Sequence, residues 1–238
     1  MKIIAHRSGT GVYPEQTIAA AAKSLEQGAD YVEMDIRYTS DKVPVICHDT
    51  SALRIFGKNS DIDKLTLTEF LSLRHVSDRR YPSHSLDDVI SCGIAPLLLH
   101  CKITGSLIKD LLSHLRKSDY EDKIILGVQH SEDVITIKNF NPSIKTLAFM
   151  RSPEDYESYV NNGVDIIRLW EQWLTEELIE KVISTGCKVW IMARDPDLGG
   201  TGYTREENLH LWEDTGIDGV LVDDVGWAIK AIGNRKSI

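Results

Sequence analysis

Long apolar runs, paired cysteines and an excess of basic residues are all lacking in this 238-residue sequence. No stretch approaches the roughly 20 apolar residues needed to cross a membrane, and the apolar run in MKIIAHRSGTG is too short for a signal peptide. The four cysteines, Cys47, Cys92, Cys101 and Cys187, form no CxxC pair, which favours reduced thiols in or near a core. We therefore expect a cytoplasmic protein without stable membrane association.

The charge balance is acidic, because 27 lysines and arginines stand against 36 aspartates and glutamates, a net charge of −9. Such a chain repels nucleic acid, and no basic stripe counters this, so a nucleic-acid partner is not expected. A small anionic substrate is compatible with the balance, because a cleft can be locally positive and a bound divalent cation supplies such charge. Nothing in the pattern indicates the oligomeric state.

Short apolar runs alternate with longer amphipathic segments along the chain. The runs are rich in Ile, Val and Leu and are bounded by Gly, Pro, Asn or Asp, which predicts buried strands. They cover residues 2–5, 30–34, 96–101, 123–127, 144–149, 164–169, 188–192 and 217–222, with an extra strand at 43–47. Helices are predicted at residues 16–27, 105–117, 131–139, 153–161, 175–185 and 204–214.

Alternating strands and helices predict a parallel sheet. Eight repeats within 238 residues favour a single α/β domain, residues 1–238, folded as a (β/α)8 TIM barrel. An open doubly wound sheet stays as the alternative, since periodicity does not show closure. Residues 49–82 are polar and irregular with one short helix near 67–73, and we expect them to form a small insertion after strand 2, over one end of the barrel.

Ionisable residues end several of the predicted strands, where barrel enzymes place their catalytic groups. They are His6 with Arg7, Glu33 with Asp35, His48, and His100 with Lys102. Glu33 and Asp35 stand two positions apart on a strand, so both side chains share one face. Adjacent carboxylates repel unless a cation lies between them, which favours a divalent metal such as Mg²⁺ or Ca²⁺. An exposed pair, or a pair bridged by Arg37, is the alternative.

His6 and His48 follow apolar strands and precede polar turns. Two such histidines fit a general base and a general acid near neutral pH, although two unrelated hydrogen-bonded histidines would show the same pattern. Arg7 offers a planar fork to phosphate oxygens and Lys102 a second positive charge, with structural ion pairs as the alternative for both. Trp170 follows a predicted strand, and we favour the wall of a substrate cleft over the barrel exterior for its ring.

Several segments together resemble the glycerophosphodiester phosphodiesterase family. His6-Arg7 with Pro14-Glu15-Gln16-Thr17 is similar to its HRG…PENT opening. Glu33-Met34-Asp35, followed by Ser40-Asp41, Pro44-Val45 and His48-Asp49, is similar to its next block. The segments at 66–70, 85–89 and 216–220 extend the resemblance over essentially the whole chain. Order and spacing agree, which makes the combination far more specific than any one segment.

The resemblance implies the barrel and the hydrolysis of a glycerophosphodiester, a small-molecule substrate, to an alcohol and glycerol 3-phosphate. It implies His6 and His48 as the acid/base pair, and Glu33 and Asp35 as ligands of Ca²⁺ or Mg²⁺. Arg7 would contact the phosphate, and Glu15 would support the site from its rim.

Some positions depart from the family's pattern. A third carboxylate ligand of the family is replaced by His100, so Mn²⁺ and Zn²⁺ become further candidates for the metal. Ser8, Gln16 and the segment 190–195 also differ, which leaves the alcohol of the substrate undetermined.

Two other functions stay open. One is a phosphodiesterase that acts on a phospholipid head group in the manner of lysophospholipase D, which an apolar groove beside residues 49–82 would favour. The other is a catalytically weak binding protein that keeps the barrel. His100 favours this second reading, and the retained histidines and carboxylates oppose it.

Overall fold

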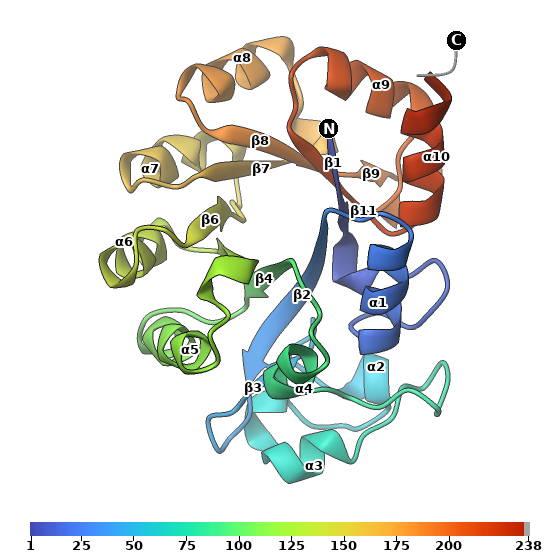
Figure 1. The fold of residues 1–238 in the computed structure, drawn as a ribbon, viewed down its shortest axis with the longest axis vertical. Helices are drawn as coiled ribbons and strands as arrows, with labels where there is room; N and C mark the ends of the chain where they lie inside the picture. The colour runs from blue at the N-terminus through green and yellow to red at the C-terminus, as the bar shows by residue number, and fades with distance from the viewer. Residues whose placement is uncertain (236–238) are drawn as a thin grey trace.

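A closed barrel of eight parallel strands lies at the centre of the computed structural model, which describes residues 1–235 (Figure 1). The strands are β1 (Lys2–Ala5), β2 (Tyr31–Tyr38), β4 (Leu97–Cys101), β5 (Ile124–Val128), β6 (Lys145–Ala148), β7 (Ile166–Trp170), β8 (Lys188–Met192) and β11 (Gly219–Val222). Neighbours pair in parallel, and β1 closes the ring by pairing with both β11 and β2. The predicted (β/α)8 barrel is confirmed, and the open sheet is excluded.

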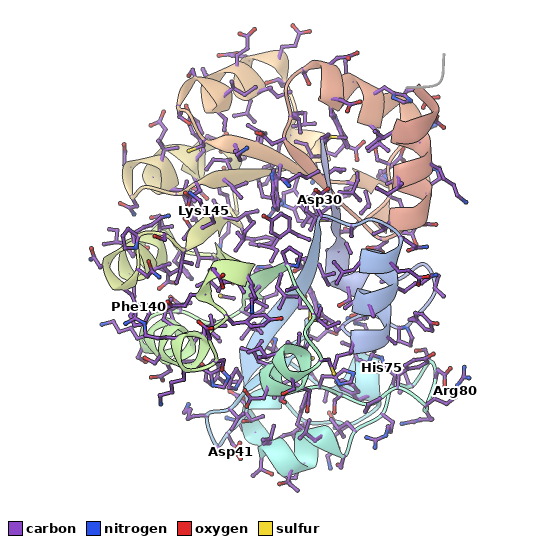
Figure 2. All side chains as sticks on the ribbon, in the orientation of Figure 1. Asp30, Asp41, His75, Arg80, Phe140 and Lys145 are labelled. Carbon is purple, nitrogen blue, oxygen red and sulfur yellow. The ribbon has the colours of Figure 1, made fainter. Side chains whose placement is uncertain are left out.

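Apolar side chains on the two faces of the strands fill two separate cores. One core fills the barrel and includes Ile4, Leu98, Leu147, Ile166, Trp190 and Leu221. The other lies between the strands and the surrounding helices, where side chains fill the space (Figure 2). β4 is buried along its whole length, as a strand covered on both faces requires. Because the barrel interior is packed, ligands are restricted to its ends.

Helices surround the barrel as an outer ring (Figure 1). They are α1 (Ile18–Glu26), α4 (Leu86–Ser91), α5 (Ser106–Lys117), α6 (Ser131–Phe140), α7 (Tyr156–Asn161), α8 (Glu176–Ser184), α9 (Glu206–Asp214) and α10 (Val225–Arg235). Thr17 and Thr175 begin α1 and α8 by accepting hydrogen bonds from the backbone of the first turn. Between residues 1 and 235, no helix combines the length and the apolar character needed to cross a membrane.

The second barrel strand is longer than predicted because a hairpin extends it. β3 (Pro44–Ile46) pairs antiparallel with the second half of β2, with Ile36 opposite Ile46 and Tyr38 opposite Pro44. The extra strand predicted at 43–47 therefore exists, outside the parallel ring. It carries the chain from the barrel directly into the insertion.

The insertion, residues 49–82, contains more structure than expected. It holds α2 (Leu53–Phe56), the 3-10 helix η2 (Ile62–Lys64) and α3 (Leu67–Leu71), so the expectation of one short helix was wrong. Its apolar residues are too widely spaced to show a helical period, yet they converge on a core of their own. This core joins Phe56, Ile62 and Phe70 to Val45 and Cys47 of the hairpin.

Other elements, most of them short, were also not predicted. α4 and α10 belong to this group, as does a small hairpin of β9 (Arg194–Asp195) and β10 (Gly200–Thr201) in the loop after β8. Four further 3-10 helices connect the main elements: η1 (His6–Ser8), η3 (Glu121–Lys123), η4 (Pro153–Asp155) and η5 (Glu171–Trp173). η1 and the β9–β10 hairpin both contribute residues to the cavity at the C-terminal ends of the strands.

Candidate active site

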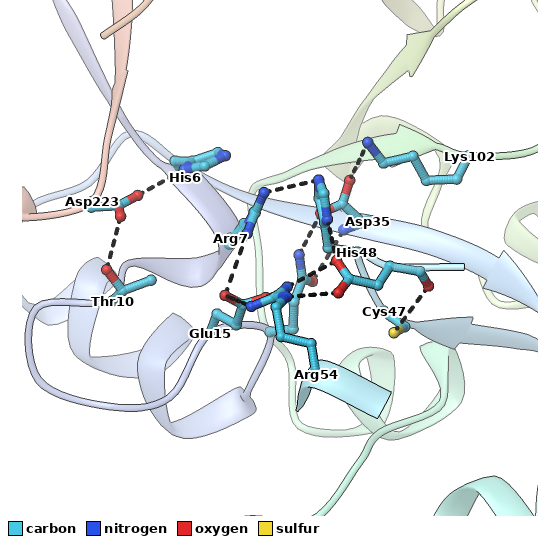
Figure 3. Close-up of polar contacts among 12 residues, drawn as sticks. His6, Arg7, Thr10, Glu15, Asp35, Cys47, His48, Arg54, Lys102 and Asp223 are labelled. Atoms are coloured by element: carbon cyan, nitrogen blue, oxygen red, sulfur yellow. Dashed lines mark hydrogen bonds and ion pairs between the residues drawn. The ribbon is translucent and has the colours of Figure 1, made fainter. Parts of the chain in front are cut away.

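His6 lies directly after β1, where a carboxylate from the neighbouring strand fixes its ring (Figure 3). Its Nδ1 is 2.7 Å from Oδ1 of Asp223, and the Thr10 hydroxyl donates to Oδ2 of the same carboxylate over 3.0 Å. A carboxylate only accepts, so the proton of the neutral ring resides on Nδ1 and Nε2 stays available. Asp223 was not predicted from the sequence, although it is a polar residue directly after β11, as the strand-end pattern of the other site residues would require.

Arg7 has a left-handed backbone conformation, with φ 48°, which is uncommon for a residue with a side chain. Two hydrogen bonds hold it there. Its N–H donates to Oε2 of Glu33 over 2.7 Å, and its carbonyl accepts from the N–H of Gln16 over 2.9 Å. The guanidinium reaches across the site, with Nη2 2.9 Å from Nε2 of His48 and Nη1 3.4 Å from Glu15.

His48 follows β3 and is held between a carboxylate and a guanidinium (Figure 3). Its Nδ1 is 2.7 Å from Oδ1 of Asp49, and Arg7 donates to Nε2. Because arginine only donates, Nε2 is an acceptor and the ring is neutral in this arrangement. Burial lowers the pKa of His48, which agrees with a neutral ring.

Arg54 from the insertion forms ion pairs with two carboxylates of the site, those of Asp49 and Glu15. Its Nε and Nη2 donate to Asp49 over 2.6 and 2.9 Å, and its Nη1 and Nη2 donate to Glu15 over 3.1 and 2.7 Å. Its hydrogen bonds lower the pKa of Asp49 to about 2, so Asp49 stays ionised beside His48. Glu15 therefore contacts Arg7 and Arg54 and is not among the residues that line the cavity.

Glu33, Asp35 and His100 form a buried cluster on two adjacent strands, β2 and β4. Asp35 and His100 are direct partners in the parallel register, and the exposed fractions of the three side chains are 2%, 1% and 9%. His100 Nδ1 lies 3.0 Å from Asp35 and 3.6 Å from Glu33. Burial acts to raise the pKa of Asp35, but the His100 hydrogen bond and the charge of Lys102, whose Nζ is 3.2 Å away, hold it well below its usual range.

The donor set of this cluster fits a divalent metal ion. Each residue offers one ligand atom, and the three atoms lie within 4.8 Å of one another. Oδ1 of Asp35 is buried without a well-directed hydrogen bond, so a lone pair is available. The Gln129 side-chain amide is 3.2 Å from Nε2 of His100. Because an amide can donate or accept, Gln129 can support His100 whether or not its Nδ1 holds a metal.

One cavity of about 340 Å³ collects these groups. Of the residues predicted from the sequence, it is lined by His6, Arg7, Glu33, Asp35, His48, His100, Lys102 and Trp170. The wall is completed by residues that the sequence did not predict: Gln129, Phe149, Met150, Arg151, Arg168 and Thr201. Gln129 and Arg151 are polar residues that follow β5 and β6, so the strand-end rule would have found these two had it been extended past Lys102.

The chain matches the model of the glycerophosphoryl diester phosphodiesterase family over residues 6–227. The chain belongs to this family. Its members are phosphoric diester hydrolases, and the matched region begins at His6, directly after β1, and includes the other seven barrel strands.

Individual relatives agree with this assignment. The glycerophosphodiester phosphodiesterase of Caldanaerobacter subterraneus is 22% identical over 238 residues, which covers 93% of each chain. The uncharacterized protein YqiK of Bacillus subtilis is 29% identical over 159 residues. That match covers 60% of this chain and 64% of YqiK, so the chain spans less than two thirds of that relative.

Among solved structures, an Oleispira antarctica phosphodiesterase in complex with the product sn-glycerol-3-phosphate superimposes with a TM-score of 0.83 at 19% identity. The superposition covers 98% of this chain and 97% of the Oleispira chain. At this identity the likeness establishes the fold alone.

Proposed function

We propose that the protein hydrolyses a glycerophosphodiester to an alcohol and glycerol 3-phosphate, with a divalent metal and two histidines. One observation carries the proposal: two histidines, each paired with its own carboxylate, face the same cavity as a buried three-ligand cluster and two cations. A decayed site would have no reason to keep both pairs, which argues against the catalytically weak binding protein.

In this proposal, Arg7 and Lys102 bind the phosphate. Both side chains line the cavity beside Glu33 and Asp35, and both are mostly buried, with exposed fractions of 22% and 12%. A divalent ion held by Glu33, Asp35 and His100 supplies further positive charge against a phosphate oxygen. Fixed charge of this kind, aimed where negative charge develops, is usually the largest catalytic contribution.

The hydrogen bonds also support an assignment of the two proton carriers. His48 Nε2 is an acceptor that is now satisfied by Arg7. When Arg7 turns to the phosphate, Nε2 becomes free to take the proton from the attacking group, which is water or the neighbouring glycerol hydroxyl. Attack by the hydroxyl would form a cyclic phosphate, and water would then open its ring to give glycerol 3-phosphate. His6 is proposed as the acid in its doubly protonated form, because the Asp223 carboxylate beside Nδ1 stabilises an imidazolium whose Nε2–H donates to the leaving alkoxide. The P–O bond to the alcohol breaks as His6 gives up its proton.

An assay of metal-stripped protein tests the function. Glycerophosphocholine and an aryl phosphodiester are incubated with EDTA-treated protein, and Mg²⁺, Ca²⁺, Mn²⁺ or Zn²⁺ is added in turn. We expect release of glycerol 3-phosphate only when metal is present. Failure to hydrolyse either substrate, or any other glycerophosphodiester, with all four metals would rule the function out.

A further inference from the structure

Arg168 is a buried cation that the proposed mechanism does not use. It lies on β7, faces the cavity, and has an exposed fraction of 3%. Its Nε and Nη1 have no hydrogen-bond partner, and no ion pair to it occurs within residues 1–235. Burial lowers the pKa of Arg168 to about 9, which is still above neutral pH, so the side chain keeps its charge.

Aromatic rings stabilise this charge without satisfying its N–H groups. The guanidinium carbon lies 4.5 Å from the ring centroid of Trp170, 5.0 Å from that of Phe149 and 6.0 Å from that of Trp173. Contact with ring faces offsets part of the cost of burying a cation. The N–H groups of Nε and Nη1 lie at the edge of the guanidinium plane, where the rings do not accept from them. Arg168 therefore lacks the hydrogen-bond acceptors that a buried arginine requires.

A second cation lines the same cavity, with an exposed side chain. This cation, Arg151, follows β6, the strand that pairs directly with β7. In the part of the chain that the structure describes, it takes part in no ion pair. The β6–β7 wall of the cavity therefore presents two arginines and no carboxylate of its own, although the charge of Glu33 on β2 acts on Arg168. On the β2–β4 side, Lys102 lies 3.2 Å from Asp35.

This charge exceeds what the scissile phosphodiester needs. The lining holds four cationic residues, Arg7, Lys102, Arg151 and Arg168, against two carboxylates, Glu33 and Asp35. A phosphodiester carries a single negative charge. The positive charges of Arg7, Lys102 and the proposed metal already balance it. The surplus lies on the wall formed by β6 and β7.

We propose that Arg168 and Arg151 form a second anion subsite, which binds a carboxylate or phosphate on the alcohol half of the substrate. The inference rests on the proposed function and narrows it, because the substrate becomes a glycerophosphodiester whose alcohol is itself anionic. Choline or ethanolamine would place a cation against two arginines, which is unfavourable in a partly buried cavity.

Turnover of matched esters tests the subsite. The glycerol 3-phosphate diesters of glycolate, 2-phosphoethanol, ethanol and choline differ mainly in the charge of the alcohol, and the first two separate a carboxylate from a phosphate. We expect the wild-type kcat/KM for at least one anionic ester to exceed that for the ethyl ester about 10-fold or more. One charge-assisted hydrogen bond would give a difference of this size. The choline ester should have the lowest kcat/KM of the four. Arg151→Gln should reduce the anionic-to-ethyl ratio about 5-fold or more, whereas Lys109→Gln, which removes an exposed cation on α5, should not change it.

Binding of small monophosphates gives a readout that does not need turnover. Calorimetry with 2-phosphoglycolate and ethyl phosphate compares ligands with and without the second anionic group. We expect 2-phosphoglycolate to bind about 10-fold more tightly, and Arg168→Gln and Arg151→Gln each to remove most of the difference. Equal affinities in the wild type, or hydrolysis of all four esters without preference, would overturn the subsite and leave the hydrolysis intact. Absence of all turnover alongside discrimination in binding would instead overturn the hydrolysis.

Discussion

At the scale of single residues, each of the two histidines in the site depends on one neighbouring carboxylate. Asp223 follows β11 and holds His6, while Asp49 follows His48 and is itself held by Arg54 of the insertion. The first pair joins residues from the two ends of the chain, and the second joins sequence neighbours, so different structural units position them. Their independence means that either histidine can be removed without disturbing the partner of the other.

Replacement of His6 or His48 by alanine should therefore abolish chemistry and preserve the fold. We expect kcat to fall by about 10²–10⁴ in each variant, the usual contribution of one acid or base, with an unchanged circular dichroism spectrum. His130→Gln, an exposed histidine on the loop after β5, serves as the control. Turnover near the wild-type rate in either alanine variant would refute the two-histidine mechanism.

In the proposed function, His100 is the ligand that sets the metal preference of the site. Its replacement by glutamate adds a third carboxylate at a position that already faces Glu33 and Asp35. Hard cations prefer oxygen ligands, so we expect the ratio of activity with Mg²⁺ to activity with Mn²⁺ to rise about 10-fold or more in His100→Glu. His130→Glu makes the same change at an exposed histidine and should not show this rise. An unchanged ratio in His100→Glu would mean that His100 is not a metal ligand.

The sequence predicted the residues near the start of the chain better than those farther along. His6, Arg7, Glu33, Asp35, His48, His100 and Lys102 stand out as polar residues at the ends of apolar strands, and they line one cavity. Arg168 was missed because it lies inside the run VDIIRLW, where apolar neighbours conceal it. Arg54 gave no signal, because its role depends on how the insertion folds back over the barrel mouth.

At the scale of elements, the middle of β5 shows how closely the barrel is packed around the metal-ligand cluster. Gly127 is the register partner of His100, and a Cβ atom there would lie within 2.8 Å of Cδ2 of Phe149. The Phe149 ring stacks on His100 with centroids 3.5 Å apart and planes 6° apart. A side chain at residue 127 would thus push on His100 through Phe149.

Gly127→Ala is expected to cost about 1–3 kcal/mol of stability, the usual range for overpacking, and to weaken metal binding by displacing His100. Chemical denaturation and a metal titration measure the two effects. Gly233→Ala in α10, where an added Cβ meets nothing within 4 Å, is the matched control. Wild-type metal affinity in Gly127→Ala would contradict the coupling between the glycine and the cluster.

The insertion contributes a pH dependence of its own. His75 is buried within it, with an exposed fraction of 3% and its ring 5.1 Å from that of Phe56 (Figure 2). Burial lowers the pKa of His75 from its ordinary value of 6.5 to about 4. Below pH 6.5 the unfolded chain binds a proton that the folded chain does not, so stability is present above that pH and is lost as the pH falls towards 4.

His75→Gln removes this titration. We expect the denaturation midpoint of the wild type to fall between pH 6.5 and pH 4 more steeply than that of His75→Gln. Exposed His130 lacks the burial that causes the effect, so His130→Gln should keep the wild-type profile. Parallel profiles for wild type and His75→Gln would show that His75 does not contribute.

Regular elements were predicted far better than irregular ones. The barrel strands and the long helices gave a clear pattern, because each is buried on both faces or along one stripe. α2, α3 and α4 span only four to six residues each, too few for a helical period to show. The β9–β10 hairpin has two-residue strands, and its formation depends on contacts such as the hydrogen bond from the Arg194 N–H to Glu171.

At the scale of the whole molecule, the cluster of Glu33, Asp35 and His100 joins the first half of the barrel. Its residues come from β2 and β4, and the neighbouring Arg7 follows β1, so a metal held there, as we propose, should stabilise the folded state as a unit. At a metal concentration of 100 times Kd the gain is about 2.7 kcal/mol, or roughly 5–10 °C in Tm for a chain of this size. Thermal unfolding with and without EDTA measures it, and Asp35→Asn should lose most of the shift. An equal shift in that variant would place the metal elsewhere.

His48 lies where the small core of the insertion meets the barrel. It follows a hairpin whose Val45 and Cys47 belong to the small core of the insertion, whereas His6 belongs to the barrel. Small cores open more often than large ones, so amide hydrogens of the insertion should exchange through partial openings that leave the barrel folded. Each such opening separates His48 from His6, so the enzyme would lose activity at denaturant concentrations at which its barrel still keeps a native spectrum.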